Sequence, residues 1–267
     1  MTASESPQGN QEQENTRPFV TPCRKLDVSA PIRWVQLGVQ DFRRAPGLSV
    51  MYGAIMMAAS WLITWWAWNV GSFTLVIMLF AGFVFIGPAL ALALYSVSCQ
   101  LDRGLKPKVF YCARQGGKRF GNQMMFSFAL LIVFLLWAKA STVMNIFLPM
   151  DAHPAAKDLI IFLGVGLVVG TLFSIIIFCI GSFSLPMMMD RDVDAITAMI
   201  TSFHAVLENK KPMFVWAAII FAAILSGFVT AYLAFLVTLP VIGYASWRGY
   251  KETIIADDWP QDPDTVS

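Results

Sequence analysis

The chain has 267 residues, of which 57% are hydrophobic and only 13% are charged. Soluble domains carry about 25% charged residues, so this composition, together with several apolar runs longer than about 18 residues, indicates a membrane protein. The net charge of +2 is too small to suggest a nucleic-acid partner, and we expect the lipid bilayer to surround most of the chain. The positions of the charges are more informative, because Lys and Arg collect on the cytoplasmic flanks of membrane helices.

Residues 1–16 are polar and predict a disordered N-terminal tail. No uninterrupted apolar core of signal-peptide length lies within residues 1–46, so the first apolar run should act as an uncleaved anchor. We expect one integral membrane domain over residues 17–255 and an acidic, mobile C-terminal tail over 256–267.

Residues 29–44, SAPIRWVQLGVQDFRR, predict an amphipathic helix that lies in the membrane interface. Ser29 can cap this helix and Pro31 fits its first turn. Its apolar face is predicted to contain Ile32, Val35, Val39 and Phe42. The residues expected at the level of the lipid headgroups are Arg33, Trp34, Arg43 and Arg44.

The apolar stretches predict an all-α fold, a polytopic bundle of about six transmembrane helices. The predicted spans are 48–68, 73–98, 124–148, 158–189, 212–227 and 228–247. The last two come from one stretch that is too long for one ordinary span and short for two. A turn at Ser226-Gly227 would give six spans and a cytoplasmic C-terminus, whereas a single tilted helix would give five and a periplasmic C-terminus. We favour six.

The segment between the second and third spans carries the strongest topology signal. Residues 99–121 contain six basic side chains and a single acid, Asp102, which predicts a cytoplasmic location. Arg43 and Arg44, two spans earlier, agree with this and give a cytoplasmic N-terminus. At the other end of the chain, a matching interfacial flank is predicted from Trp247, Arg248, Tyr250 and Lys251.

An acid-rich segment after the fourth span predicts the start of a cytoplasmic surface helix. Its acids, which suit the positive end of a helix dipole, are Asp190, Asp192 and Asp194. Capping is favoured for them over binding of a divalent cation. The helix should run to about Glu208, with an apolar stripe of Val193, Ile196, Ile200, Phe203 and Leu207. Lys210 and Lys211 then lead into the next span.

The chain divides into three units, each a surface helix followed by two apolar helices, and the second span of each unit contains a proline. These helix-breaking prolines are Pro88, Pro186 and Pro240. Proline frees a backbone carbonyl one turn earlier, which must find a partner inside the bundle. The prolines could flank a polar cavity, as broken helices do in transporters, but packed kinks are the favoured interpretation.

Lys139 is an isolated charge in the third predicted span, and a charge in a span is a candidate functional residue. A possible substrate or ion path would include Lys139, Ser141, Thr142 and Asn145. The alternative, a structural lysine whose stem reaches toward the periplasmic interface, is favoured. Gly166 and Gly170 form a GxxxG-like pair that could pack closely against another helix, within or between chains.

No catalytic, cofactor or metal site is predicted. His153 and His204 lie outside the predicted spans, whereas a haem centre needs imidazoles inside the bundle. The four cysteines form no CxxC pair, and the P-loop, GxSxG and HExxH motifs are absent from the sequence.

Three stretches carry a resemblance to a known family: GPALALALYSVSCQLDRG, LPMMMDRDVDAITAMITSFHAVLENKKPM and LPVIGYASWRGYKE. Over about residues 18–252 the chain resembles a family of uncharacterised, mostly proteobacterial inner-membrane proteins. Some of its members carry an automatic label of cytochrome c oxidase subunit I. The resemblance implies a six-span protein of the bacterial inner membrane and supplies no catalytic residues.

These observations predict an integral inner-membrane protein that is non-enzymatic and acts as an accessory, assembly or partner-binding protein. Its expected partners are the lipid bilayer and either another membrane protein or a second copy of the chain. The alternative is a transporter or channel for a small solute, with Lys139 in the pathway.

Overall fold

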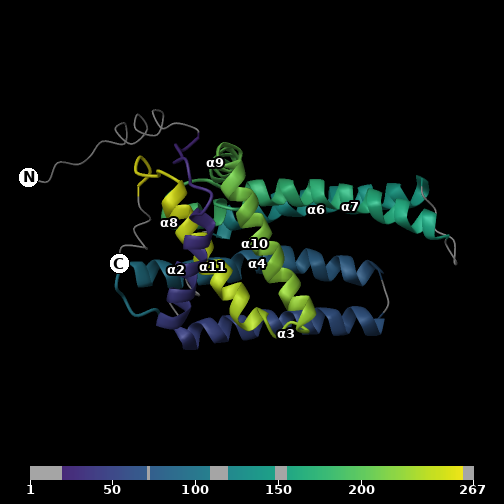
Figure 1. Cartoon of the computed structure of the whole chain (residues 1–267), viewed down its shortest axis with the longest axis horizontal. Coiled ribbons are helices and arrows are strands. Elements are labelled where there is room, and N and C mark those ends of the chain that lie inside the picture. Colours follow the sequence, from purple (N-terminus) through teal and green to yellow (C-terminus); the bar gives the residue numbers. More distant parts are fainter. Residues whose placement is uncertain (1–19, 71–72, 109–119, 148–154, 261–267) are drawn as a thin grey trace, which may run out of the picture.

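The structure is a computed structural model that describes residues 20–70, 73–108, 120–147 and 155–260 (Figure 1). It is all-α, as predicted: the described residues form helices, apart from turns, short connections and isolated bridge residues, among them the bridge between Cys23 and Ile254. The helices are α2 (Ala30–Arg44), α3 (Pro46–Val70), α4 (Phe73–Asp102), α6 (Phe120–Phe147), α7 (Ala156–Gly181), α8 (Ser184–Asp190), α9 (Ala195–Glu208), α10 (Lys210–Val229) and α11 (Phe235–Thr253).

Four stretches of the described residues are long and apolar enough to cross a membrane: Pro46–Asn69, Gly121–Met144, Ala156–Asp190 and Lys210–Val229. Their helical form follows from long apolar runs in which backbone groups pair within the segment. The second half of α4 and all of α9 are shorter apolar helices. The fold is therefore a helical membrane bundle, and the number of crossings stays a prediction.

The predicted fourth span, 158–189, is two helices in the structure. Helix α7 ends at Gly181 and α8 begins at Ser184. The break is held by Ser202 of α9, which accepts a hydrogen bond from the Phe183 backbone N–H at 3.1 Å and donates one to the Cys179 carbonyl at 2.8 Å. The Ser202 side chain thus replaces backbone hydrogen bonds of the helix at this point. The sequence at Ser182–Phe183 contains no proline or glycine that would predict the break.

Helices α10 and α11 are separated by a turn at 230–234, four residues later than the expected turn at Ser226-Gly227. Ala231 and Tyr232 have positive φ angles of 49° and 68°. The Trp61 indole of α3 donates to the Ala231 carbonyl at 2.9 Å, which holds the turn against α3. Gly227 serves packing instead: a Cβ there would lie 2.0 Å from the Phe235 ring.

Burial corrects the expected position of one residue and shows which face of α9 packs on the protein. Trp34 of α2 is fully buried, whereas the headgroup level had been expected for it. Three residues of the predicted apolar stripe, Ile196, Phe203 and Leu207, are each more than 40% exposed, whereas Ile200 is half-buried and Val193 is buried. The buried face of α9 consists mainly of small side chains, Ala195, Thr197, Ala198, Thr201, Ser202, Ala205 and Val206. Small residues allow α9 to pack closely on α7 and α8.

The buried core lies at one end of the bundle, where both described chain ends also lie (Figure 1). Figure 1 shows α3, α4, α6 and α7 running away from this end, with α2 across it. Helix α11 packs on α2, α3, α4 and α10. Its C-terminal half brings the largest buried side chains together, among them Trp247 and Tyr250.

The first residues of the expected C-terminal tail belong to this core. Ala256 and Trp259 are each 4% exposed. The Ile255 backbone N–H donates to the Pro22 carbonyl at 2.9 Å, and the Asp192 N–H donates to the Pro260 carbonyl at 3.0 Å. Residues 256–260 are therefore packed, which corrects the predicted start of a mobile tail; residues 1–16 and 261–267 lie outside the described residues.

Candidate functional site: a polar network around the end of α11

The last two turns of α11, WRGYKET, contact three other helices through side chains that leave the helix in different directions. Their partners lie on α2, at the end of α4 and at the end of α8. We call these contacts the α11 network. It lies at the core end of the bundle, beyond the most apolar part of α11.

The first part of the network surrounds Asp41 of α2, a carboxylate that is only 1% exposed. The Arg248 guanidinium donates to both of its oxygens, with Nη2 at 2.9 Å from Oδ1 and Nε at 3.0 Å from Oδ2. Ser98 Oγ donates to Oδ2 at 2.7 Å. Arg248 also pairs with Asp102, whose other oxygen accepts from the Trp247 indole at 3.0 Å. The fork of an arginine suits such bidentate pairing.

The second part surrounds Asp190, the last residue of α8. Its side chain is 3% exposed and accepts from Tyr250 Oη at 2.8 Å and Lys251 Nζ at 3.2 Å. Arg191 Nε lies 3.3 Å from the same oxygen, and Arg191 Nη1 donates to the Trp259 carbonyl at 2.7 Å. Burial, with the adjacent Asp190 charge, raises the pKa of Tyr250 well above its usual value. Tyr250 is therefore a neutral hydrogen-bond donor at physiological pH.

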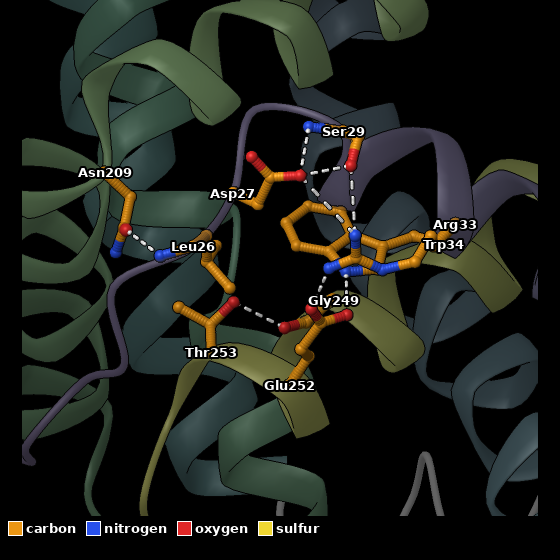
Figure 2. Close-up of polar contacts among 9 residues, drawn as sticks. All are labelled: Leu26, Asp27, Ser29, Arg33, Trp34, Asn209, Gly249, Glu252 and Thr253. Atoms are coloured by element: carbon orange, nitrogen blue, oxygen red, sulfur yellow. Dashed lines mark hydrogen bonds and ion pairs between the residues drawn. The ribbon is translucent and has the colours of Figure 1, made fainter.

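The third part joins α11 to α2 through Glu252 (Figure 2). One Glu252 oxygen accepts from Arg33 at 2.7 Å, and the other accepts from the Trp34 indole at 2.8 Å. The Trp34 ring packs edge-on against Trp216 and Phe183, with centroids 5.5 and 6.4 Å away. Gly249 allows this approach, because a Cβ there would lie 2.9 Å from the indole.

Each of the four carboxylates in the α11 network thus has a cationic partner. Buried charges are tolerated when they are paired and hydrogen-bonded, and they destabilise strongly when one partner is lost. The arrangement fixes the relative positions of α2, α4, α8 and α11. The network is therefore structural: it holds these helices together, because each acid in it is already paired with a cation.

The residues of the predicted substrate or ion path all lie on α6, away from the α11 network. Lys139 is exposed on α6, Ser141 is half-buried and Thr142 donates to the Ala138 carbonyl of its own helix at 3.0 Å. The side chain of Asn145 lies outside what the structure describes. Leu135, Leu136 and Val143 around Lys139 are themselves exposed apolar side chains. A role of these residues in a substrate path stays a prediction.

All three prolines are buried, and they lie at different positions along their helices. Pro88 lies inside α4 and Pro240 inside α11, and both helices continue through the proline. Pro186 lies in the first turn of α8, where a missing N–H costs least. Whether they flank a cavity stays a prediction.

The predicted acidic helix start is divided between two elements. Asp194 caps α9 and accepts from the Ile196 and Thr197 N–H groups, both at 3.0 Å. Burial raises the pKa of Asp194, but these hydrogen bonds outweigh it and bring the pKa below its ordinary value. Asp190 instead ends α8 in the α11 network, and Asp192 lies in the connection between the helices. Within the described ranges, no cluster of three or more His, Cys, Asp and Glu side chains could hold a metal ion.

Sequence reasoning missed Asp41, Ser98 and Glu252 and placed Trp34 and Arg248 at the lipid interface. A signal was present: Asp41 is an acid within a helix of otherwise apolar, polar and basic side chains. A lone acid near a membrane surface needs a cationic partner. Asp102, Asp190 and Arg248 come one each from the three stretches that carry the family resemblance. All three residues belong to the α11 network.

The fold and its long apolar helices define a multi-pass integral membrane protein. Over residues 75–190 the chain matches the family described as predicted integral membrane protein (DUF2189). The matched range runs from the start of α4 to the end of α8 and includes Asp102 and Asp190. No curated protein and no solved structure matches the chain.

Proposed function

We propose that this chain is a non-enzymatic accessory protein of the bacterial inner membrane, with a cytoplasmic N-terminus, and that its α6–α7 hairpin binds a transmembrane helix of another membrane-protein chain. The observation that carries the proposal is the exposure of α7. None of the residues in the 18-residue apolar window of Ala156–Asp190 is buried. Helix α7 packs on α6, α8 and α9, and the last two lie at its C-terminal end.

Glycines on α7 support a helix as the occupant of this surface. A Cβ at Gly164 or Gly170 would meet nothing within 4 Å, while one at Gly166 would touch Met144 of α6 at 3.5 Å. Lipid tails are as apolar as a helix surface, so helices associate in membranes by close packing at small residues. Exposed leucines and valines beside the glycines, among them Leu167 and Val168, would pack around such a contact.

The α11 network also supports this proposal, because it holds the C-terminal end of the α6–α7 hairpin in place. It fixes α8 to α11 through Asp190 and Lys251, and α8 follows directly after α7. A hairpin anchored at one end can present a constant surface along the rest of its length. Partner binding then costs little ordering of the chain.

The test is photocrosslinking in native membranes, with a photoreactive side chain at Leu167, which is 72% exposed. We expect a protein adduct from this position that Gly170→Leu abolishes. Gly121→Leu is the matched control, because Gly121 also has open space around it, at the start of α6. A product of twice the mass of the chain would identify the partner as a second copy. Adducts with lipid alone at Leu167 would contradict the proposal.

A further inference from the structure

A basic groove lies where α9 ends and α10 begins. Its cavity has a volume of about 430 Å³ and is lined by three segments. The N-terminal segment contributes Lys25, the end of α9 contributes Leu207 and Glu208, and the start of α10 contributes Lys210 and Lys211. The α11 network does not use any of these five residues.

The charge of the groove is positive. Lys25, Lys210 and Lys211 are all exposed, and no carboxylate of the described residues pairs with them. Glu208 is the single acid in the lining. Ammonium groups are point charges with three donors each, and they bind phosphate oxygens readily.

The groove is held in shape by Asn209, which is 3% exposed. Its Oδ1 accepts from the Leu26 backbone N–H at 2.8 Å, as Figure 2 shows, and its Nδ2 donates to the Arg24 carbonyl at 3.1 Å. These two backbone groups flank Lys25 in the chain. One buried amide therefore fixes the backbone of Lys25 opposite the two lysines of α10, so little ordering is needed when an anion binds.

The surroundings of the groove are apolar. Leu207 is 44% exposed at its edge, Phe203 is 43% exposed one turn earlier on α9, and Phe214 is 77% exposed on α10. Helix α10 continues from the groove as an apolar stretch long enough to cross a membrane. An anion in the groove would therefore lie at the boundary of the hydrocarbon layer, with apolar side chains below it.

We propose that this groove binds the phosphate of an anionic phospholipid, whose acyl chains lie along Leu207 and Phe214. The lysines supply the charge for the headgroup, and the exposed apolar side chains select a lipid over a phosphate in solution. The proposal does not depend on partner binding by α7. Each lysine near a membrane surface contributes about fivefold to the affinity for anionic lipid.

The experiment measures lipid adducts on the purified full-length protein by native mass spectrometry. Phosphatidylglycerol and phosphatidylcholine with the same acyl chains are the two probes. We expect phosphatidylglycerol to bind at least about tenfold tighter, and the triple variant Lys25→Ala, Lys210→Ala, Lys211→Ala to lose this preference. The matched control, Arg103→Ala, Lys106→Ala, Lys108→Ala, removes the same charge outside the groove and should keep it.

A variant expected to raise the affinity for phosphatidylglycerol distinguishes a loss of binding from misfolding. Glu208→Gln removes the one acid of the groove, so it should raise the affinity for phosphatidylglycerol by about threefold to fivefold. Equal losses in the two triple variants, or an unchanged preference in the groove variant, would overturn the proposal. Displacement of the lipid by inorganic phosphate at millimolar concentration would overturn the choice of a lipid as the ligand.

Discussion

Single side chains of α11 neutralise carboxylates that the fold buries. Arg248 binds both oxygens of Asp41, which also accepts a hydrogen bond from Ser98 and has the more distant Arg44 nearby. A buried charge without its partner is far less favourable than two apolar side chains in the same place. The stability of this end of the bundle should therefore depend on the pair as a unit.

We expect Arg248→Met to lower the free energy of unfolding by about 3–5 kcal/mol, because Asp41 would stay buried without its cation. The midpoint of SDS-induced unfolding in mixed micelles measures the effect. The double variant Asp41→Leu, Arg248→Met should recover much of the loss. A double variant no more stable than Arg248→Met would show that the pair does not act as a unit.

At the scale of helices, glycines set how closely α11 approaches its neighbours. Gly53 of α3 lies against the α11 backbone: a Cβ there would be 2.3 Å from the Leu236 carbonyl oxygen. Gly38 of α2 faces α11 in the same way, with 2.6 Å to the Val241 oxygen. Backbone cannot move aside as a flexible side chain can, so a larger residue must displace a whole helix.

Gly53→Ala should destabilise the protein by about 1–3 kcal/mol, because the added methyl group forces α3 and α11 apart. Gly47→Ala in the same helix is the control: nothing lies within 4 Å of a Cβ there, and alanine favours a helix by up to about 1 kcal/mol. Thermal unfolding in detergent would compare them. Equal stabilities of the two variants would be inconsistent with a tight α3–α11 contact.

For the whole molecule, the two chain ends determine how many times the chain can cross a membrane. The Arg24 N–H donates to the Thr253 carbonyl at 2.8 Å, and Cys23 pairs with Ile254 in an isolated bridge. Segments in direct backbone contact outside the apolar helices lie on the same side of the bilayer. We therefore predict an even number of crossings, and six is the number that the sequence favours.

A reporter fused after Ser267 should therefore be active only if it works in the cytoplasm, and a periplasm-specific reporter there should be silent. The same periplasmic reporter fused after Ala231, in the turn between α10 and α11, should be active. A periplasmic reporter that is active after Ser267, together with a cytoplasmic N-terminus, would mean an odd number of crossings. That combination would be incompatible with the pairing of residues 22–24 with 253–255.

The sequence by itself determined the class of protein and most of its helices, because long apolar runs and capping residues act locally. The α2 helix, the α9 cap at Asp194 and the apolar stretches were all visible in this way, although the Ser29 side chain makes no capping hydrogen bond to α2. The tertiary structure alone decided which side chains meet. Asp41 and Arg248 are separated by 207 positions, and the break after Gly181 depends on Ser202 of another helix.

Periodicity finds an apolar face, but whether lipid or protein covers that face depends on where neighbouring helices pack. For this reason Trp34 lies in the core instead of at the lipid headgroups, and Gly227 packs between two helices instead of forming a turn.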